Sequence, residues 1–395
     1  MSRLGDIFNL VGGGTPTTSI EEYWGNGTPW ISSADIDQSG RIVYRRRVTP
    51  SGVANSTTNV VPGGTVIVVT RVGLGKVAQL TEDTCFSQDI QALLARETAP
   101  AYNSRFLMYQ LLFKMQTVKY SGRGTTISGI TKKQLADVSL YFPPLPEQER
   151  IVARIEELFS QLDAGVETLK KTKAQLAVYR QAVLKEAFDS IEASFYHPLR
   201  AAILGSPQNG LYKPKSDYCD NGTPILRIDG FYDGFILNDY SFKRVSLSAE
   251  EIERYRLELG DLVVNRVNSM PYLGKCALVR SLIEPTVFES NMMRIKLDTD
   301  KVEGDWITYY LSSHGGRKEL TKNAKQAVNQ ASINQTDVGN ALVPIPSINE
   351  QKRLVTVIES RLSVCDSIEQ TVDAALQQAE AMRQSILKDS FEGRL

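Results

Sequence analysis

The chain of 395 residues is poor in the side chains that build metal sites and hydrolytic centres. It has two histidines, His197 and His314, and four widely spaced cysteines, none in a Cys-x-x-Cys pair. Zinc sites and disulfide frameworks need clusters of such residues, and a catalytic triad needs a histidine beside its nucleophile. The composition therefore predicts reduced thiols, as in a cytoplasmic protein, with no metal site and no triad.

Long hydrophobic runs are also missing. No stretch approaches the roughly 20 apolar residues of a membrane-spanning helix, and the N-terminal MSRLGDIFNLVGGG lacks the charged-then-apolar pattern of a secretory signal. We expect a cytoplasmic protein without membrane contact. The 45 basic and 45 acidic residues give zero net charge, which argues against a uniformly basic nucleic-acid binder. Residues 1–143 carry more basic than acidic side chains, so a local basic face is compatible with a neutral whole.

Nucleotide-binding and methyl-transfer motifs are incomplete. The sequence GLGK at Gly73 is too short for a phosphate loop, and VGGGT at Val11 lacks the strand and helix of a dinucleotide fingerprint. The run Tyr141-Phe142-Pro143-Pro144 lacks the polar residue with which amino-methyltransferases hold a target amine. No carboxylates show a spacing that implies acid–base catalysis. We expect a protein that binds rather than catalyses, with no catalytic residues.

What the sequence does contain is an internal repeat. PPLPEQERIVARIEELF begins at Pro143, and PIPSINEQKRLVTVIESRL begins at Pro344. Glu147 aligns with Glu350, an offset of 203 (350 − 147), and the match continues without a gap to Phe188 and Phe391. Shared helical periodicity would not also align the Glu-Gln and Arg-Gln pairs. The pattern therefore indicates duplication.

The repeat extends beyond these segments. NGTPWIS from Asn26 is matched by NGTPILR from Asn221, and VVPGGTVIVVTRVGLGKVAQL, which predicts two strands around a Gly-rich turn, is matched by LELGDLVVNRVNSMPYLGKCALV. ISGITKKQL also resembles ASINQTDV. We expect a globular domain at 1–143, a helix at 144–190, a second globular domain at 191–345 and a second helix at 346–395.

The two repeated segments predict long helices with a coiled-coil seam. Apolar residues recur every three or four positions, with weak points at Gly165, Thr172 and Arg361. Because a globular segment separates the copies, we expect them to pair antiparallel within the chain; two separate surface helices are the alternative. The predicted pairing residues are Ile151, Ile155, Leu158, Leu162, Leu169, Leu176, Val183, Leu354, Ile358, Ile368, Val372, Met382 and Ile386.

Polar segments of both globular domains suggest a nucleic-acid surface. Arginine can read guanine and Asn or Gln can read adenine, whereas Lys and Thr suit phosphates. Ordinary solvated surface, such as an exposed hairpin at Arg41–Arg47, is the alternative. The candidate DNA-binding residues are Arg41, Tyr44, Arg45, Arg46, Arg71, Lys76, Lys119, Arg123, Thr125, Thr126, Asn265, Arg266, Asn268, Tyr272, Lys275, Arg317, Lys322, Lys325, Gln326, Asn329 and Gln330.

PLPEQERIVARIEELFSQLD and its second copy resemble the conserved helices of the specificity subunit of type I DNA restriction–modification enzymes. The second copy has one extra residue before its Glu-Gln pair, reading Pro346-Ser347-Ile348-Asn349-Glu350-Gln351. The resemblance implies an α+β fold with two target-recognition domains, joined by two long helices in an antiparallel intramolecular coiled coil with internal pseudo-two-fold symmetry. Each domain would bind one half of a split double-stranded DNA target, and the helices would set the spacer.

The same resemblance implies the partners and cofactors. Two modification subunits would use S-adenosylmethionine to methylate adenine, and two restriction subunits would use ATP and Mg to translocate and cut DNA. The chain itself would bind none of these cofactors. The alternatives are a coiled-coil scaffold that reads no DNA and a stand-alone enzyme of the fused methyltransferase kind. The resemblance does not identify the recognised bases.

Overall fold

The computed structural model describes residues 1–120, 129–232, 234–237 and 241–394, with side chains of 116–120 excepted. The chain forms two compact units. Unit 1 comprises Met1–Leu169 and Ala374–Leu395, and unit 2 comprises Lys170–Asp373. The division falls inside both long helices, so each unit contains one globular domain and parts of two helices.

Unit 1 is built on a four-stranded antiparallel sheet with strand order β2-β8-β5-β6. Every residue of β5 is buried, because α3 and a first apolar core cover one face and a second core covers the other. The pairing of β5 with β6 confirms the strand pair predicted around the Gly-rich turn. The elements are β2 (Phe8–Gly12), β5 (Val66–Val69), β6 (Val77–Gln79), β8 (Ile90–Ala95) and α3 (Ser104–Tyr120).

A smaller sheet of order β4-β3-β7 lies in the same unit. Strand β3 is antiparallel to β4 and parallel to β7. Its members are β3 (Trp24–Ile31), β4 (Arg46–Val48) and β7 (Cys85–Phe86).

Unit 2 repeats both sheets, with one additional strand, β12, at the edge of the smaller one. Strand order β11-β21-β17-β19 matches the first sheet of unit 1, and β13 is again antiparallel to one neighbour, β16, and parallel to the other, β20. This shared topology confirms the duplication predicted from the sequence. The strands are β11 (Gln208–Asn209), β12 (Tyr218–Cys219), β13 (Thr223–Leu226), β16 (Lys243–Val245), β17 (Asp261–Asn265), β19 (Cys276–Leu278), β20 (Val287–Phe288) and β21 (Met292–Lys296).

The repeated Asn-Gly-Thr-Pro sequence has a steric cause. A Cβ atom on Gly27 would lie 2.1 Å from the carbonyl oxygen of Val48, and one on Gly222 would lie 2.3 Å from that of Val245. Glycine therefore allows β4 and β16 to approach the strand beside them.

Shorter elements complete both units. The first residues of each globular domain pair with the strand that precedes its long helix, as β1 with β9 and β10 with β24. These elements are β1 (Ser2–Arg3), α1 (Leu4–Ile7), α2 (Pro50–Ala54), α4 (Lys132–Ala136), β9 (Ser139–Leu140), β10 (Tyr196–Pro198), β14 (Phe231–Tyr232), β15 (Phe235–Ile236), α6 (Ala249–Tyr255), β18 (Val267–Asn268), α7 (Gly304–Ser312), α8 (His314–Thr321), β22 (Lys325–Gln326), β23 (Ala331–Ser332), α9 (Gln335–Asn340) and β24 (Leu342–Pro344).

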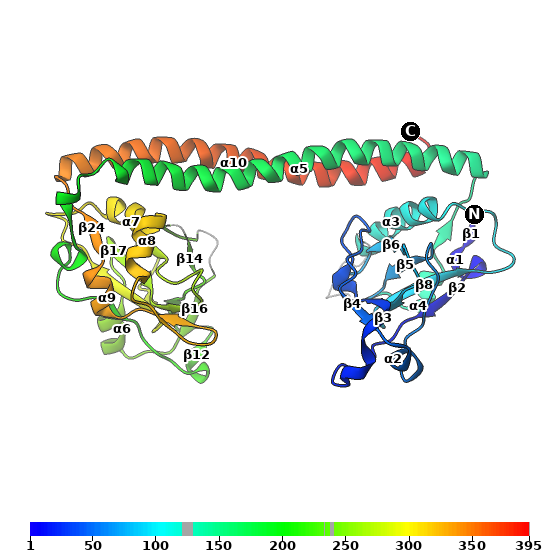
Figure 1. The fold of residues 1–395 in the computed structure, drawn as a ribbon, viewed down its shortest axis with the longest axis horizontal. Helices are drawn as coiled ribbons and strands as arrows, with labels where there is room; N and C mark the ends of the chain where they lie inside the picture. The colour runs from blue at the N-terminus through cyan, green and yellow to red at the C-terminus, as the bar shows by residue number, and fades with distance from the viewer. Residues whose placement is uncertain (121–128, 233, 238–240, 395) are drawn as a thin grey trace. The chain divides into compact units, whose positions relative to one another are not determined.

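The two long helices are α5 (Leu145–Asp189) and α10 (Ile348–Phe391), which lie inside the segments predicted for them. Figure 1 shows them side by side. In unit 2, Lys173 contacts Asp373 at 2.6 Å and Arg180 contacts Asp366 at 2.6 Å. Residue numbers thus rise along α5 as they fall along α10, which confirms antiparallel pairing. In unit 1, Arg383 forms an ion pair with Asp163.

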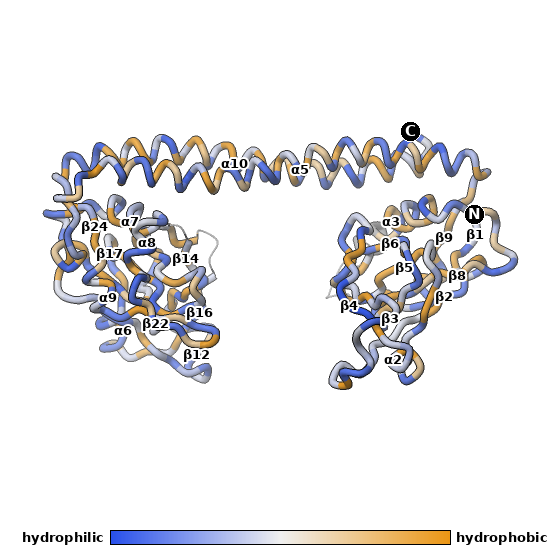
Figure 2. The backbone as a smooth tube through the Cα atoms, in the orientation of Figure 1, coloured by the Kyte–Doolittle hydropathy of each residue, from blue (hydrophilic) through white to orange (hydrophobic). Residues whose placement is uncertain are grey.

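The seam between the helices is a strict heptad. Figure 2 shows apolar and polar residues alternating along both helices. Buried positions recur every seven residues along each helix, at Ile155, Leu176, Val183, Ile358, Cys365, Val372 and Ala379, and Ile155 and Ile358 also belong to the globular cores.

Two predicted pairing residues lie outside this seam, since Ile368 is 40% and Met382 is 47% exposed. Two helices enclose only a narrow stripe, so the second apolar position of these heptads remains at the rim. Other apolar residues form a stripe that packs on the globular core of the same unit and that the heptad pattern did not identify: Val152, Phe159, Leu184, Val355 and Leu387. No helix among the described residues is long and apolar enough to cross a membrane.

Candidate nucleic-acid interface

Strand β4 in unit 1 carries adjacent cations with different environments. Arg47 donates from Nη1 to the carbonyl oxygen of Gly27 at 3.0 Å, and its Nη2 lies 3.8 Å from Oε2 of Glu82. The Arg46 guanidinium lies over the Trp24 ring, 5.8 Å from its centroid. Within the described chain, the side chain of Arg46 has no hydrogen bond or ion pair. Arg47 is therefore engaged internally, whereas Arg46 is available to a ligand.

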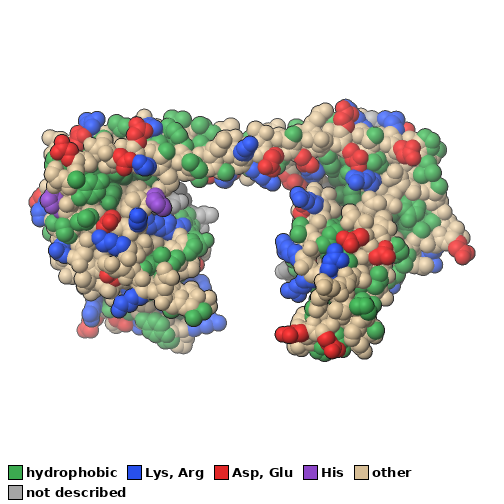
Figure 3. Space-filling view, viewed as in Figure 1, with side chains coloured by type: hydrophobic (Ala, Val, Ile, Leu, Met, Phe, Trp, Pro, Cys, Tyr) green, Lys and Arg blue, Asp and Glu red, His purple; other side chains and the backbone are tan. Residues whose placement is uncertain are grey.

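These residues border a shallow concave surface. Figure 3 shows Lys and Arg side chains gathered on the edge of unit 1 that carries β4. Arg45 lies 3.4 Å from a carboxylate oxygen of Asp35. The lining residues are Thr18, Glu21, Trp24, Gly25, Arg45, Arg46 and Arg47, in which three cations face one carboxylate.

Strand β16 reproduces this arrangement in unit 2. Arg244 donates from Nη1 to the carbonyl oxygen of Gly222 at 2.9 Å and to Oε2 of Glu284 at 3.1 Å. The hydrogen bond from Arg244 lowers the pKa of Glu284, so the pair is ionised at neutral pH and Arg244 is engaged. The neighbouring Lys243 is exposed and, in the part of the chain that the structure describes, its side chain has no hydrogen bond or ion pair.

Lys243 and Arg244 were not among the residues predicted from the sequence. They also border a concave surface, which is lined by Tyr218, Cys219, Asp220, Phe242, Lys243 and Arg244. The register of β16 against β13, compared with that of β4 against β3, would have identified Lys243 and Arg244. Pro29 pairs with Arg47 as Pro224 pairs with Arg244, so the repeated Asn-Gly-Thr-Pro sequence aligns the two strands.

Among the other predicted residues of unit 1, some side chains form internal hydrogen bonds and others are exposed. Tyr44 accepts a hydrogen bond at its hydroxyl from the Thr81 amide at 3.2 Å, and Lys76 donates to the carbonyl oxygen of Ser33 at 2.9 Å. Arg41 and Arg71 are exposed. Four further predictions lie outside the described residues: the side chain of Lys119, and Arg123, Thr125 and Thr126.

In unit 2, the prediction that Asn265 is a DNA contact at the surface is wrong. Its side chain is 1% exposed, because β17 lies between β21 and β19 in the middle of the sheet. Arg317 donates to the carbonyl oxygens of Leu273 and Pro271, so its guanidinium holds the loop that follows β18. The sequence alone did not distinguish this internal role from a free basic side chain.

Aromatic and basic side chains gather beside the same loop. The Lys275 ammonium lies 4.1 Å from the ring centroid of Tyr232 and 4.7 Å from that of Tyr272. Arg266 is half-buried and donates to the carbonyl oxygen of Ser290 at 3.0 Å. Tyr272 itself is 44% exposed, so its ring is accessible to a ligand.

The strands β22 and β23 form an exposed hairpin. The Ala327 amide donates to the carbonyl oxygen of Gln330 at 2.7 Å and closes its turn. Val328 at the tip is 99% exposed. Most of the predicted residues beyond Arg317 lie on this hairpin, all exposed: Lys325, Gln326, Asn329 and Gln330.

The hairpin joins β18 in a three-stranded sheet, which brings Asn268 close to the other amide residues. Asn268 and Gln326 both pair with Ala331. Lys322, just before the hairpin, lies 2.7 Å from a carboxylate oxygen of Glu319 and is partly neutralised. The sheet of β18, β23 and β22 thus assembles Asn268 with the hairpin amides on one projecting element.

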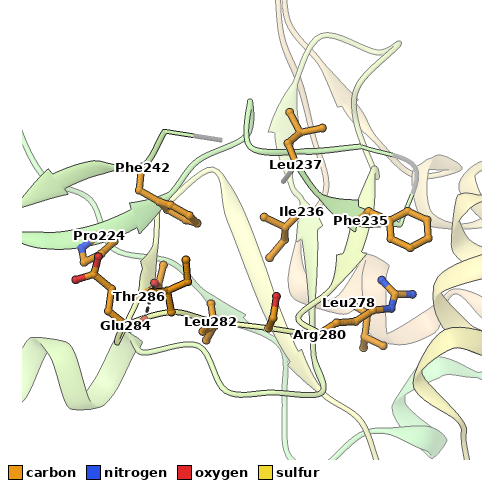
Figure 4. A pocket seen from close by; sticks show the side chains of 12 residues that line it. Pro224, Phe235, Ile236, Leu237, Phe242, Leu278, Arg280, Leu282, Glu284 and Thr286 are labelled. Atoms are coloured by element: carbon orange, nitrogen blue, oxygen red, sulfur yellow. Dashed lines mark hydrogen bonds between the residues drawn. The ribbon is translucent and has the colours of Figure 1, made fainter. Parts of the chain in front are cut away.

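A separate apolar pocket lies next to β16 (Figure 4). Its charged residues are already engaged, since Glu284 pairs with Arg244 and Arg280 pairs with Asp305. Its remaining lining is mainly apolar, including Phe235, Ile236, Leu237, Leu278 and Leu282. Such a lining offers no unpaired cation to a phosphate, so we exclude this pocket from the candidate interface. Among the described residues, no group of three His, Cys, Asp or Glu side chains could hold a metal ion.

Comparison with known proteins identifies a family. The model of the type I restriction modification DNA specificity domain matches residues 1–177 and 203–378. The chain is 28% identical over 286 residues to the type I restriction enzyme EcoKI specificity subunit of Escherichia coli strain K12, covering 69% of this chain. It is also 28% identical over 285 residues to the StySPI specificity subunit of Salmonella potsdam. The match spans 61% of the length of each of these relatives.

A solved structure has a similar fold. It comes from work on the complex assembly and conformational transition of a type I R-M system, and it matches with a TM-score of 0.71 at 20% identity. The match covers 100% of this chain and 97% of the other. At this identity the similarity concerns the fold alone.

Proposed function

Because this chain belongs to the family of type I restriction–modification DNA specificity proteins, we propose that it is the DNA-reading subunit of such a complex and that each unit binds one half of a bipartite double-stranded target. The observation that carries the proposal is the same pair of sheets built twice, with different polar residues on the projecting segments. Two similar scaffolds with different polar surfaces suit a target with two unlike halves.

In unit 2, the hairpin of β22 and β23 is the proposed base-reading element. A two-stranded ribbon fits the major groove of B-DNA, and Asn or Gln can bond an adenine edge bidentately. Gln326, Asn329 and Gln330 are exposed amides on this ribbon, and Lys325 adds a cation. The turn uses only the backbone carbonyl of Gln330. Among the described residues no hydrogen bond engages the side chains of Gln326, Asn329 and Gln330, so their amides are available to a base.

The paired helices are the proposed spacer and docking platform. Their repeated sequences give the chain two equivalent helical surfaces, one in each unit. A pseudo-symmetric chain of this kind suits two identical methyltransferase subunits. The spacer length would then depend on the length of the helices.

Catalysis and cofactor binding are assigned to the partners. Two modification subunits would bind S-adenosylmethionine and methylate adenine, and two restriction subunits would use ATP and Mg. This chain would contribute the DNA contacts and hold the partners. Its cations are positioned for binding, as in the free Arg46 and Lys243.

Mapping adenine methylation across a genome tests the proposal. The chain is expressed with its modification subunit, and the methylated sites are sequenced. The expected result is one bipartite motif with a fixed spacer. Two outcomes contradict the proposal and favour a scaffold that reads no DNA. One is methylation that shows no bipartite motif, and the other is the absence of any methylation that depends on this chain.

Replacing residues 1–143 with the corresponding domain of another family member refines the test. One half of the motif should change, while the other half and the spacer are retained. A change in both halves would contradict the assignment of one half-site to each unit.

A further inference from the structure

The strands β4 and β16 share a pattern of charge that the base-reading hairpin does not explain. In both, the arginine that pairs with the proline of Asn-Gly-Thr-Pro is engaged by a glycine carbonyl and a glutamate. The residue before it, Arg46 or Lys243, is exposed, and its side chain has no hydrogen bond or ion pair within the described residues. One cation is thus committed and one is free, at the same register in each unit.

The two free cations share charge but not hydrogen-bonding geometry. Arginine presents a planar fork that can bond a guanine edge in two places, whereas lysine presents a compact ammonium. A base-reading position would depend on that difference. A phosphate accepts either group, since it mainly requires positive charge.

The surroundings of both cations also suit a phosphate. Arg46 and Lys243 each border a concave surface, where cations outnumber the single carboxylate, Glu21 in one and Asp220 in the other. An aromatic residue lies beside each, and the Trp24 ring supports the Arg46 guanidinium from one face. The Arg46 side chain is exposed, so its guanidinium is accessible to a ligand.

We infer that Arg46 and Lys243 are equivalent phosphate anchors, each holding the DNA backbone of one half-site without reading its sequence. The inference rests on the proposed function and deepens it, because it separates positioning contacts from base-reading contacts in both units. The paired arginines, Arg47 and Arg244, hold each strand against its neighbour and do not contact DNA.

The test uses the complex of this chain with its modification subunits and a random-sequence duplex of about 40 base pairs. Binding is measured by fluorescence anisotropy between about 50 and 200 mM salt. Each phosphate contact contributes about 0.9 to the slope of log K against log salt. We expect Arg46→Gln and Lys243→Gln each to lower this slope by about 0.9, and the double variant to lower it by about twice as much.

A matched control is Arg96→Gln, which removes an exposed arginine just after β8, outside the candidate residues and the paired helices, and should leave the slope unchanged. Methylation mapping of the same variants should return the wild-type motif, with uniformly weaker occupancy. The inference is overturned if either variant leaves the slope unchanged or if it relaxes the sequence of a half-site.

The two proposals fail in different ways. A wild-type complex that shows no salt-dependent binding and no bipartite methylation motif overturns the proposed function. If the wild-type complex shows salt-dependent binding and a bipartite motif, but the Arg46 and Lys243 variants keep the full slope, only the inference of phosphate anchors is overturned.

Discussion

Gln148 and Gln351, aligned by the sequence repeat, make the same three hydrogen bonds in their own units. Oε1 of Gln148 accepts from the Asn103 amide at 2.8 Å, and its Nε2 donates to the carbonyl oxygens of Ala101 and Pro143. Oε1 of Gln351 accepts from the Glu303 amide at 2.9 Å, and its Nε2 donates to those of Lys301 and Pro346. Both side chains are 0% exposed. The repeated glutamine thus joins each long helix to its globular domain.

The first prediction concerns this joint. Gln148→Ala or Gln351→Ala leaves three backbone groups without partners, of which the carbonyl of Pro143 or Pro346 is in a buried hydrogen bond and the other two are partly buried. The cost is roughly 1–3 kcal/mol for each group that water cannot reach. Hydrogen exchange should increase mainly in the unit that carries the variant. Gln161→Ala, at an exposed position on α5, is the control and should change little. Equal exchange in the Gln148 and Gln161 variants would contradict the role of the joint.

The second prediction concerns the Asn-Gly-Thr-Pro glycines. Gly27→Ala or Gly222→Ala places a methyl group about 2 Å from a backbone carbonyl oxygen, so the strand must move. We expect a loss of about 1–3 kcal/mol in the free energy of unfolding, as for other overpacked sites. Urea denaturation measures it. An unchanged urea midpoint would show that the strand can move away from its neighbour without a loss of stability.

The third prediction is a stabilising change. Gly165 lies within α5, and a Cβ there meets nothing within 4 Å. Gly165→Ala should therefore raise the free energy of unfolding by about 0.5–1 kcal/mol, because alanine loses less backbone freedom in a helix. Thermal unfolding of the two proteins, side by side, measures it. A lower melting temperature would mean that the helix pair requires a residue without a side chain at this position.

The fourth prediction concerns the hairpin. Replacing Asn329 and Gln330 by alanine should relax one half of the methylation motif and leave the other intact, with about 1–3 kcal/mol of discrimination lost for each base contact removed. Gln377→Ala removes an exposed amide from α10 and serves as the control. A motif unchanged in the hairpin variant would assign base reading to other residues.

The fifth prediction concerns the spacer. Seven residues inserted after Leu169 and after Val372 preserve the heptad phase of both helices. Seven helical residues rise about 10.5 Å and one base pair about 3.4 Å, so the spacer should lengthen by at most about three base pairs. Both half-sites should be retained. Methylation mapping that returns the original spacer would contradict the role of the helices.

The predictions from sequence succeeded where the signal is local and failed where it depends on distant partners. The apolar run Val66–Val69 and its Gly-rich turn predicted a strand pair that the structure contains. The charge of Arg317 suggested DNA binding, but its guanidinium bonds the carbonyl oxygens of a loop more than forty positions earlier. Lys243 was missed because a short strand in a polar segment carries little periodicity.

The sequence by itself determined the duplication, the two long helices and the family, because periodicity and repeated residues are properties of the chain read in order. Only the tertiary structure decided which cations are free. Arg47 meets Glu82 and Arg244 meets Glu284 because segments distant in sequence fold together, while the side chains of Arg46 and Lys243 beside them form no ion pair among the described residues. Whether a charge is neutralised within the fold depends on such long-range pairing, which local sequence does not encode.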